Sequence, residues 1–275
     1  MYTPINLGFD MRLSDSVITR SKMKLHTILL SGSHFRIGQL SFYPSLVPLY
    51  AVVHALFWLP VGYFIAIAYD HVQPIVPYTS ALGIYPPEKY MFMALMGSYG
   101  VLTIISQWLW CFMMRKKFKR KSWSTVGQHL CVLSAITFTV SGICIVILSF
   151  INMKSDNRTH YNLTLLNFIC HTIGIPLSTL LVAYVFRPWV WFCLARVLVS
   201  LQMIIGSYSF VYFNKAGLRV LDAEDFYYIK SHEPGYKEIA LSAFSEWFVI
   251  FGCVELTLIT GLELRKYEKQ YADKD

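Results

Sequence analysis

Two glutamates, Glu246 and Glu255, interrupt a long apolar stretch near the C-terminus and are the side chains best suited to chemistry. A pair of carboxyl groups can act as general acid and base, or can relay protons. On a helix, however, a separation of nine residues at about 100° per residue leaves the two side chains about half a turn out of phase. They therefore cannot form one carboxylate dyad, and structural hydrogen bonding is the simpler role.

Histidines and cysteines form no recognisable site. His54, His129 and His171 share no spacing typical of metal ligands, and the sequence has no CxxC pair. It also has no phosphate-binding glycine loop, no G-x-S-x-G elbow and no HExxH motif. We therefore expect no catalytic residues, no metal, no cofactor and no enzymatic activity.

The apolar stretches that hold these residues indicate a membrane protein. Apolar residues make up 55% of the 275 residues and charged residues only 15%, and the mean hydropathy is +0.47. This composition excludes a disordered chain and an ordinary soluble domain. Each apolar block has about the 20 residues that a membrane-spanning helix needs, twice the length of a barrel strand.

The sequence predicts an all-α fold, a polytopic bundle of six transmembrane helices. The spans lie at roughly 48–69, 91–113, 126–151, 165–186, 190–213 and 239–263. Residues 1–47 are expected to form a cytosolic N-terminal extension, residues 48–263 the transmembrane domain, and residues 264–275 a cytosolic tail.

Lysine and arginine predict the orientation, because positively charged loops stay in the cytosol. With both termini cytosolic, 17 of the 24 basic residues face the cytosol and 7 face the opposite side. The third loop then faces the lumen and carries two N-glycosylation sequons, at Asn157 and Asn162. Asn162 lies close to the start of span four, so Asn157 is the better acceptor.

Six basic residues follow span two within seven positions: Arg115, Lys116, Lys117, Lys119, Arg120 and Lys121. Anionic lipids of the cytosolic leaflet attract each such residue by about 1 kcal/mol near the surface, which favours a contact with phosphoinositide or phosphatidylserine. The alternative is a topology determinant that only retains the loop in the cytosol. Expected partners are the bilayer, anionic lipids and membrane or cytosolic proteins still to be identified, with no nucleic acid.

Glu246, Glu255 and Arg196 are predicted to lie inside the membrane, where a charge costs about 2.5–3.5 kcal/mol and needs a partner or water. Glu246 is near the lumenal end of span six, where His160 of the third loop can approach it. Glu255 lies deeper, and we expect it to face a neighbouring helix.

The first outer loop, residues 70–88, is the most distinctive stretch. Four prolines and a glycine exclude a helix across it, so it is either an ordered lumenal cap or a flexible linker. Its tyrosine and isoleucine content favours the cap.

This loop, placed between two helices, reads H-V-x-P-x-x-P-Y-x-S-x-x-G-x-x-P-P-E and resembles the damage-regulated autophagy modulator (DRAM) family. That family is grouped with the transmembrane protein 150 group and GPI-lipid-remodelling factors. The resemblance covers about residues 48–263 and extends to His160, Arg196 and Glu246. In the loop it rests on His71, Val72, Pro74, Pro77, Tyr78, Ser80, Gly83, Pro86, Pro87 and Glu88.

The resemblance implies a non-enzymatic, multi-pass modulator of autophagy and endolysosomal membrane function, located in the lysosomal or endosomal membrane. Its sister groups imply an alternative, a plasma-membrane adaptor for phosphatidylinositol 4-kinase or anionic lipid, and a further one, a lipid-remodelling or transport protein. The chain departs from the family pattern at Ala81, where members carry aspartate, and at Asn162 and Leu163, where they carry glycines. Glu255 stands where relatives are apolar, so we expect it to be particular to this chain.

Overall fold

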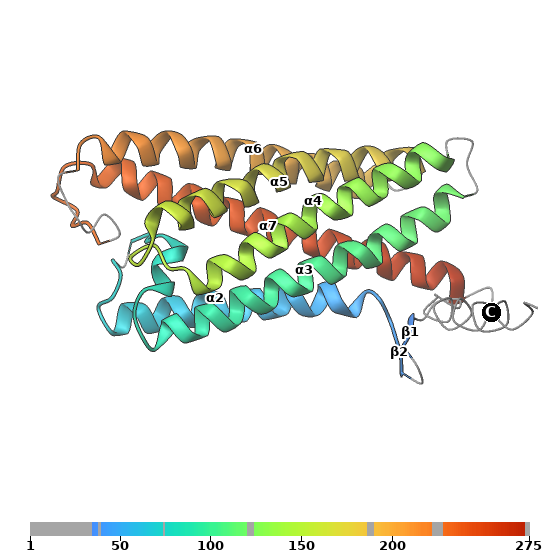
Figure 1. Cartoon of the computed structure of the whole chain (residues 1–275), viewed down its shortest axis with the longest axis horizontal. Helices are drawn as coiled ribbons and strands as arrows, with labels where there is room; N and C mark the ends of the chain where they lie inside the picture. The colour runs from blue at the N-terminus through green and yellow to red at the C-terminus, as the bar shows by residue number, and fades with distance from the viewer. Residues whose placement is uncertain are drawn as a thin grey trace, which may run out of the picture.

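The computed structural model describes residues 35–37, 40–73, 75–119, 124–185, 190–221 and 228–272. Within them run six long helices: α2 (Leu46–Ala68), α3 (Glu88–Phe118), α4 (Ser124–Phe150), α5 (Asn157–Val185), α6 (Val190–Leu218) and α7 (Tyr236–Ala272) (Figure 1). Each is long and apolar enough to cross a membrane, so the predicted six-span, all-α bundle is confirmed. Pro74, Arg120 and Lys121 of the predicted sites, and most of the N-terminal extension, lie outside the described residues.

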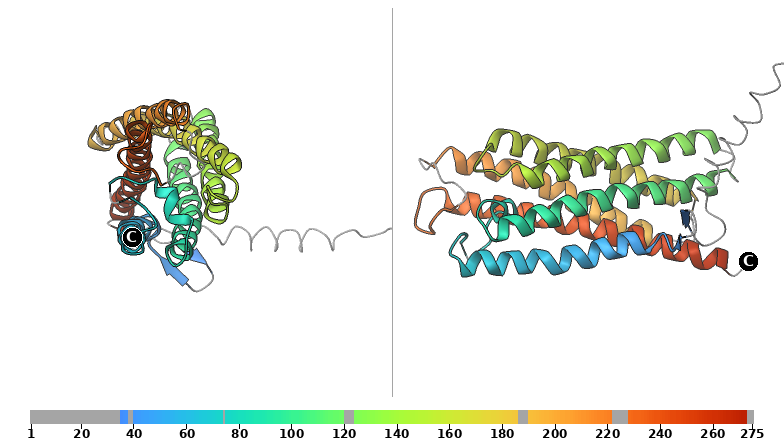
Figure 2. Two further views of the ribbon diagram at one scale, coloured as in Figure 1. Left: turned by 90° about the vertical axis from the view of Figure 1, so that its left-hand side faces the viewer. Right: turned by 60° about the horizontal axis from the view of Figure 1, so that its bottom comes forward.

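The helices are arranged as a ring in the order of the chain. Each packs against its sequence neighbour, and α7 closes the ring by packing against α2 (Figure 2). Contacts of α3 with α5 and α7 fill the middle of the bundle. Neighbouring helices run antiparallel, because each connection joins two helix ends on the same side of the ring (Figure 1).

The ring has two distinct ends. One, the loop end, carries the connections α2–α3, α4–α5 and α6–α7 (Figure 1). The other, the terminal end, carries the start of α2, the end of α7 and a short antiparallel hairpin of β1 (Phe35–Ile37) and β2 (Leu40–Phe42). Under the predicted orientation the loop end is lumenal and the terminal end cytosolic.

Most of the helices are longer than the spans predicted from hydropathy. Helix α7 has 37 residues and is therefore about 55 Å long, whereas the hydrocarbon core of a bilayer is about 30 Å thick. Hydropathy marks only the part of a helix that is immersed in lipid, so it misses the turns that continue into the interface. The largest difference is in α7, which ends at Ala272 rather than near residue 263, and α5 begins at Asn157 rather than near residue 165.

Small residues let α3 and α4 approach closely. A Cβ atom at Gly100 would lie 2.7 Å from the carbonyl oxygen of Gly142, and one at Gly142 would lie 2.8 Å from that of Gly100. Backbone contact of this kind is typical of packing between membrane helices, where burying apolar surface gives no advantage over lipid.

Candidate functional site: the cap and its cavity

The loop between α2 and α3, the cap, folds back over the loop end of the bundle. The prediction that this loop contains no helix is wrong for one short segment, the 3₁₀ helix η1 (Thr79–Gly83), because its prolines lie outside those five residues. This segment is buried along its whole length. A Cβ atom at Gly83 would lie 2.8 Å from the Phe92 ring, so only glycine lets the cap pack this close to α3. The structure therefore has the ordered cap that the loop composition favours, rather than a flexible linker.

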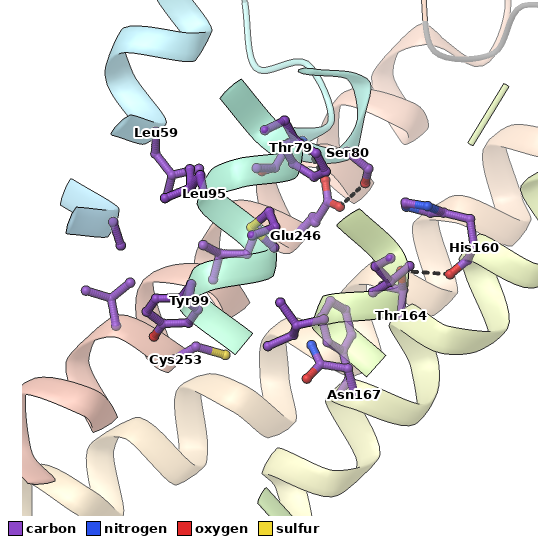
Figure 3. A pocket seen from close by; sticks show the side chains of 18 residues that line it. Leu59, Thr79, Ser80, Leu95, Tyr99, His160, Thr164, Asn167, Glu246 and Cys253 are labelled. Atoms are coloured by element: carbon purple, nitrogen blue, oxygen red, sulfur yellow. Dashed lines mark hydrogen bonds between the residues drawn. The ribbon is translucent and has the colours of Figure 1, made fainter. Parts of the chain in front are cut away.

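Two neighbouring residues of α7, Glu246 and Trp247, form hydrogen bonds with the cap. The Glu246 carboxylate accepts a hydrogen bond from the backbone N–H of Thr79 at 2.7 Å and another from the Ser80 hydroxyl (Figure 3). The Trp247 indole N–H donates to the carbonyl oxygen of Pro77 at 2.8 Å. Glu246 is only 5% exposed, so this carboxylate fastens a loop inside the bundle.

Tyr78 connects the cap to α6. Its hydroxyl accepts a hydrogen bond from the Asn214 side-chain amide at 3.0 Å, and its ring packs edge-on against Phe210. The side chain is 3% exposed. The cap is thus attached to α6 as well as to α7.

His71 and Glu88 close the base of the cap. His71 Nδ1 lies 2.6 Å from Glu88 Oε1, and Glu88 is fully buried in the first turn of α3. A carboxylate is favoured there by the helix dipole. Pro87 occupies the position before Glu88 and, with Pro86, is exposed.

His160 lies in the first turns of α5 and is 5% exposed. Its Nδ1 is 2.6 Å from the carbonyl oxygen of Ile151, which can only accept, so Nδ1 carries the proton and Nε2 is the unprotonated nitrogen of the neutral ring. The structure places His160 beside the cavity that Glu246 also lines (Figure 3).

Two adjoining cavities, an inner and an outer chamber, lie beneath the cap. The inner chamber, of about 60 Å³, lies within the bundle among α2, α3, α4, α5 and α7. The outer chamber, of about 220 Å³, lies between α5 and α6 at the loop end. Ser80, His160 and Thr164 line both.

Arg196 belongs to a separate polar cluster towards the terminal end. Its guanidinium donates two hydrogen bonds to the Glu263 carboxylate, both at 2.8 Å, and a third to the Ser178 hydroxyl at 2.9 Å. The Trp110 indole N–H donates to the same carboxylate at 2.7 Å. Arg196 is 1% exposed and Glu263 is fully buried, so the two charges neutralise each other inside the bundle.

Sequence reasoning identified Arg196 but missed Glu263 and Trp110. Glu263 marks the predicted end of span six, which concealed its depth, because α7 continues nine residues beyond it. The available signal was Arg196 itself, since an arginine within a span requires an acidic or polar partner at the same depth.

The expectation that Glu255 faces a neighbouring helix is wrong. Its side chain is exposed on the outer surface of α7. Phe248, Phe251, Leu258 and Leu262 share that exposure at helical spacing, so Glu255 interrupts an apolar stripe that faces lipid.

The basic segment lies at the terminal end of α3. Arg115, Lys116 and Lys117 form the last turn of the helix, and Lys119 follows it. Lys117 also turns towards α7, where its ammonium group lies 5.1 Å from the centre of the Tyr267 ring. At the opposite end, Asn157 and Asn162 are exposed in the first turns of α5.

A family model, described as the Frag1/DRAM/Sfk1/Cwh43P N-terminal domain, matches residues 43–267. No curated protein and no solved structure matches the chain. The matched range contains the cap and all six helices to within a few residues of their ends. The chain belongs to the Frag1/DRAM/Sfk1/Cwh43 family of membrane proteins.

Proposed function

We propose that this protein is a non-enzymatic modulator of autophagy and of endolysosomal membrane function. One observation supports a non-enzymatic role. Glu246 and Ser80, two polar side chains beside the cavity with the means to react, are both engaged in holding the cap to the bundle. A carboxylate used as a structural acceptor is a poor general base, because accepting a proton would weaken the contacts that position it.

Loss-of-function cells test the proposal. Deleting the gene should change autophagic flux during starvation, and re-expressing the wild-type chain should restore it. Normal flux and normal lysosome number in the deleted cells would contradict the proposal. Imaging a C-terminally tagged chain against lysosomal and plasma-membrane markers tests the compartment separately.

A second candidate is an adaptor for phosphatidylinositol 4-kinase or for anionic lipid at the plasma membrane. The observation that favours it is the meeting of two basic segments at the terminal end. Arg115, Lys116 and Lys117 end α3, while Lys266 and Lys269 lie on the last turns of α7 at the same end. Together they present a positive surface to any anionic leaflet there.

Replacing the six basic residues at 115–121 with glutamine should reduce binding to vesicles that contain phosphatidylinositol 4-phosphate and leave membrane insertion intact. Replacing Lys230 and Lys237 at the loop end is the control for loss of charge. Equal vesicle binding by the wild-type chain and the first variant would exclude the adaptor.

A further inference from the structure

The outer chamber has a polar, positively charged mouth. Arg158 of α5 and Lys215 of α6 both line it, and both are exposed. Among the described residues, none that lines this chamber carries a carboxyl group. Asp156 is the nearest acidic residue in sequence, but its carboxylate accepts the Thr159 backbone N–H at 3.0 Å, which caps the start of α5.

The neutral lining also favours an anionic group. Asn157, Tyr161 and Asn214 contribute amide and hydroxyl groups from the two helices. Two cations and neutral hydrogen-bonding groups therefore converge on one chamber.

The mouth lies where lipid head groups are expected. Tyr208 and Tyr212 are exposed and stacked on the outer face of α6, with ring centres 6.2 Å apart. Tyrosine collects at the boundary between hydrocarbon and head groups. Lys215 lies about one turn further towards the loop end, and beyond such a tyrosine boundary we expect the phosphate groups.

The inner chamber shares Ser80, His160 and Thr164 with the outer chamber, and Asn167 and Glu246 are among the other polar residues of its lining. Most of its wall is apolar and includes Leu59, Leu95, Ile145, Leu148, Ile250 and Val254. One water-sized group needs roughly 10–15 Å³ of such a volume, so a chamber of about 60 Å³ holds about four or five groups. It fits the end of one hydrocarbon chain.

We propose that the two chambers form a binding site for an anionic amphiphile, a membrane lipid with a phosphate head and an apolar chain. The phosphate lies in the outer chamber between Arg158 and Lys215. The end of one chain passes Thr164 and enters the inner chamber. This site does not depend on the autophagy role, since binding is measured on the purified chain.

Three probes separate the parts of the ligand. Lysophosphatidic acid has an anionic head and one chain, lysophosphatidylcholine has a neutral head and one chain, and glycerol 3-phosphate has the head alone. Native mass spectrometry of the purified full chain in detergent should show lysophosphatidic acid binding most tightly, with each of the others at least about fivefold weaker. Equal binding of lysophosphatidylcholine would overturn the role of the cations, and equal binding of glycerol 3-phosphate would overturn the role of the chain.

Variants then test the residues. Arg158→Gln and Lys215→Gln should each weaken lysophosphatidic acid binding about fivefold, as expected for loss of one surface charge, and the double variant about 25-fold. Arg219→Gln is the matched control, because Arg219 is exposed near the end of α6 but does not line the chamber. Unchanged binding in the double variant, or an equal loss in the control, would refute the site.

Thr164→Phe provides a variant with unchanged charge. Thr164 lines both chambers, so the larger side chain should block the proposed route of the lipid chain between them. Binding of lysophosphatidic acid should then fall to the level of glycerol 3-phosphate, while binding of glycerol 3-phosphate stays the same. A thermal unfolding curve establishes that this variant is folded. Wild-type affinity of a folded Thr164→Phe protein for lysophosphatidic acid would show that no chain enters the inner chamber.

Discussion

At the residue scale, the polar side chains of this protein act in pairs that join distant parts of the chain. Glu246 joins α7 to the cap, and Glu263 joins α7 to Arg196 of α6. In a membrane interior an unpaired charge costs several kcal/mol, so each carboxylate is stable only with its partners. The pairs therefore fix which helix faces which neighbour.

The attachment of the cap to Glu246 is expected to depend on its two acceptor oxygens. Glu246→Leu removes both and leaves the Thr79 N–H and the Ser80 hydroxyl without their acceptor. Each buried group left without a partner should lower the free energy of unfolding by about 1–3 kcal/mol. Hydrogen exchange should rise in residues 75–88 before it rises in the helices. Unchanged exchange in the cap would show that Glu246 does not hold it.

The Arg196–Glu263 pair makes a different prediction. Arg196→Met leaves an uncompensated carboxylate and should destabilise the protein by about 3–5 kcal/mol. The double variant Arg196→Met with Glu263→Leu should recover much of that loss, although Trp110 and Ser178 lose their partners. Thermal unfolding of the two single variants and the double variant gives the coupling energy. Losses that simply add would mean that the two residues act independently.

At the element scale, hydropathy predicted the number and order of the helices because lipid immersion requires about 20 apolar residues in each. It did not predict where α5 and α7 begin and end, since helix turns in the interface carry polar residues. The prolines and Gly83 left either an ordered cap or a flexible linker, and the tyrosine and isoleucine content of the loop favoured the cap. Its attachment to Glu246, 166 positions away from Ser80, was not predictable, because such contacts depend on the packing of α7 against the rest of the ring.

The exposed face of α7 gives a prediction for this element. Glu255→Leu completes the apolar stripe and removes a side chain that costs about 2.5–3.5 kcal/mol in the middle of a span. The inserted fraction of the isolated α7 segment in microsomal membranes should therefore rise, and the full protein should remain folded. Phe251→Leu on the same stripe is the control for a change in shape. Reduced stability of the Glu255→Leu protein would mean that its carboxyl group makes a contact that its exposure does not indicate.

At the scale of the whole molecule, the terminal end and the loop end of the ring differ chemically. The terminal end carries the basic segment, and the loop end carries the cap, the outer chamber and both sequons. The six helices within the described residues give that part of the chain an even number of crossings, whereas the side that faces the cytosol rests on the charge distribution alone. The orientation is therefore the property of the whole molecule that most needs a direct measurement.

Glycosylation of the α4–α5 side of the protein measures its orientation in the membrane. If the loop end is lumenal, Asn157 at the exposed start of α5 should carry a glycan, and glycosidase treatment should increase the mobility of the wild-type protein. Asn157→Gln should abolish that shift, whereas Asn162→Gln should leave it intact, because Asn162 lies about one helical turn nearer the membrane. A cytosolic protease should then cut in the α3–α4 connection and leave the α4–α5 connection intact. The opposite cleavage pattern, together with the absence of a glycan, would show that the orientation is reversed. The proposed anionic-lipid site would then lie in the cytosolic leaflet.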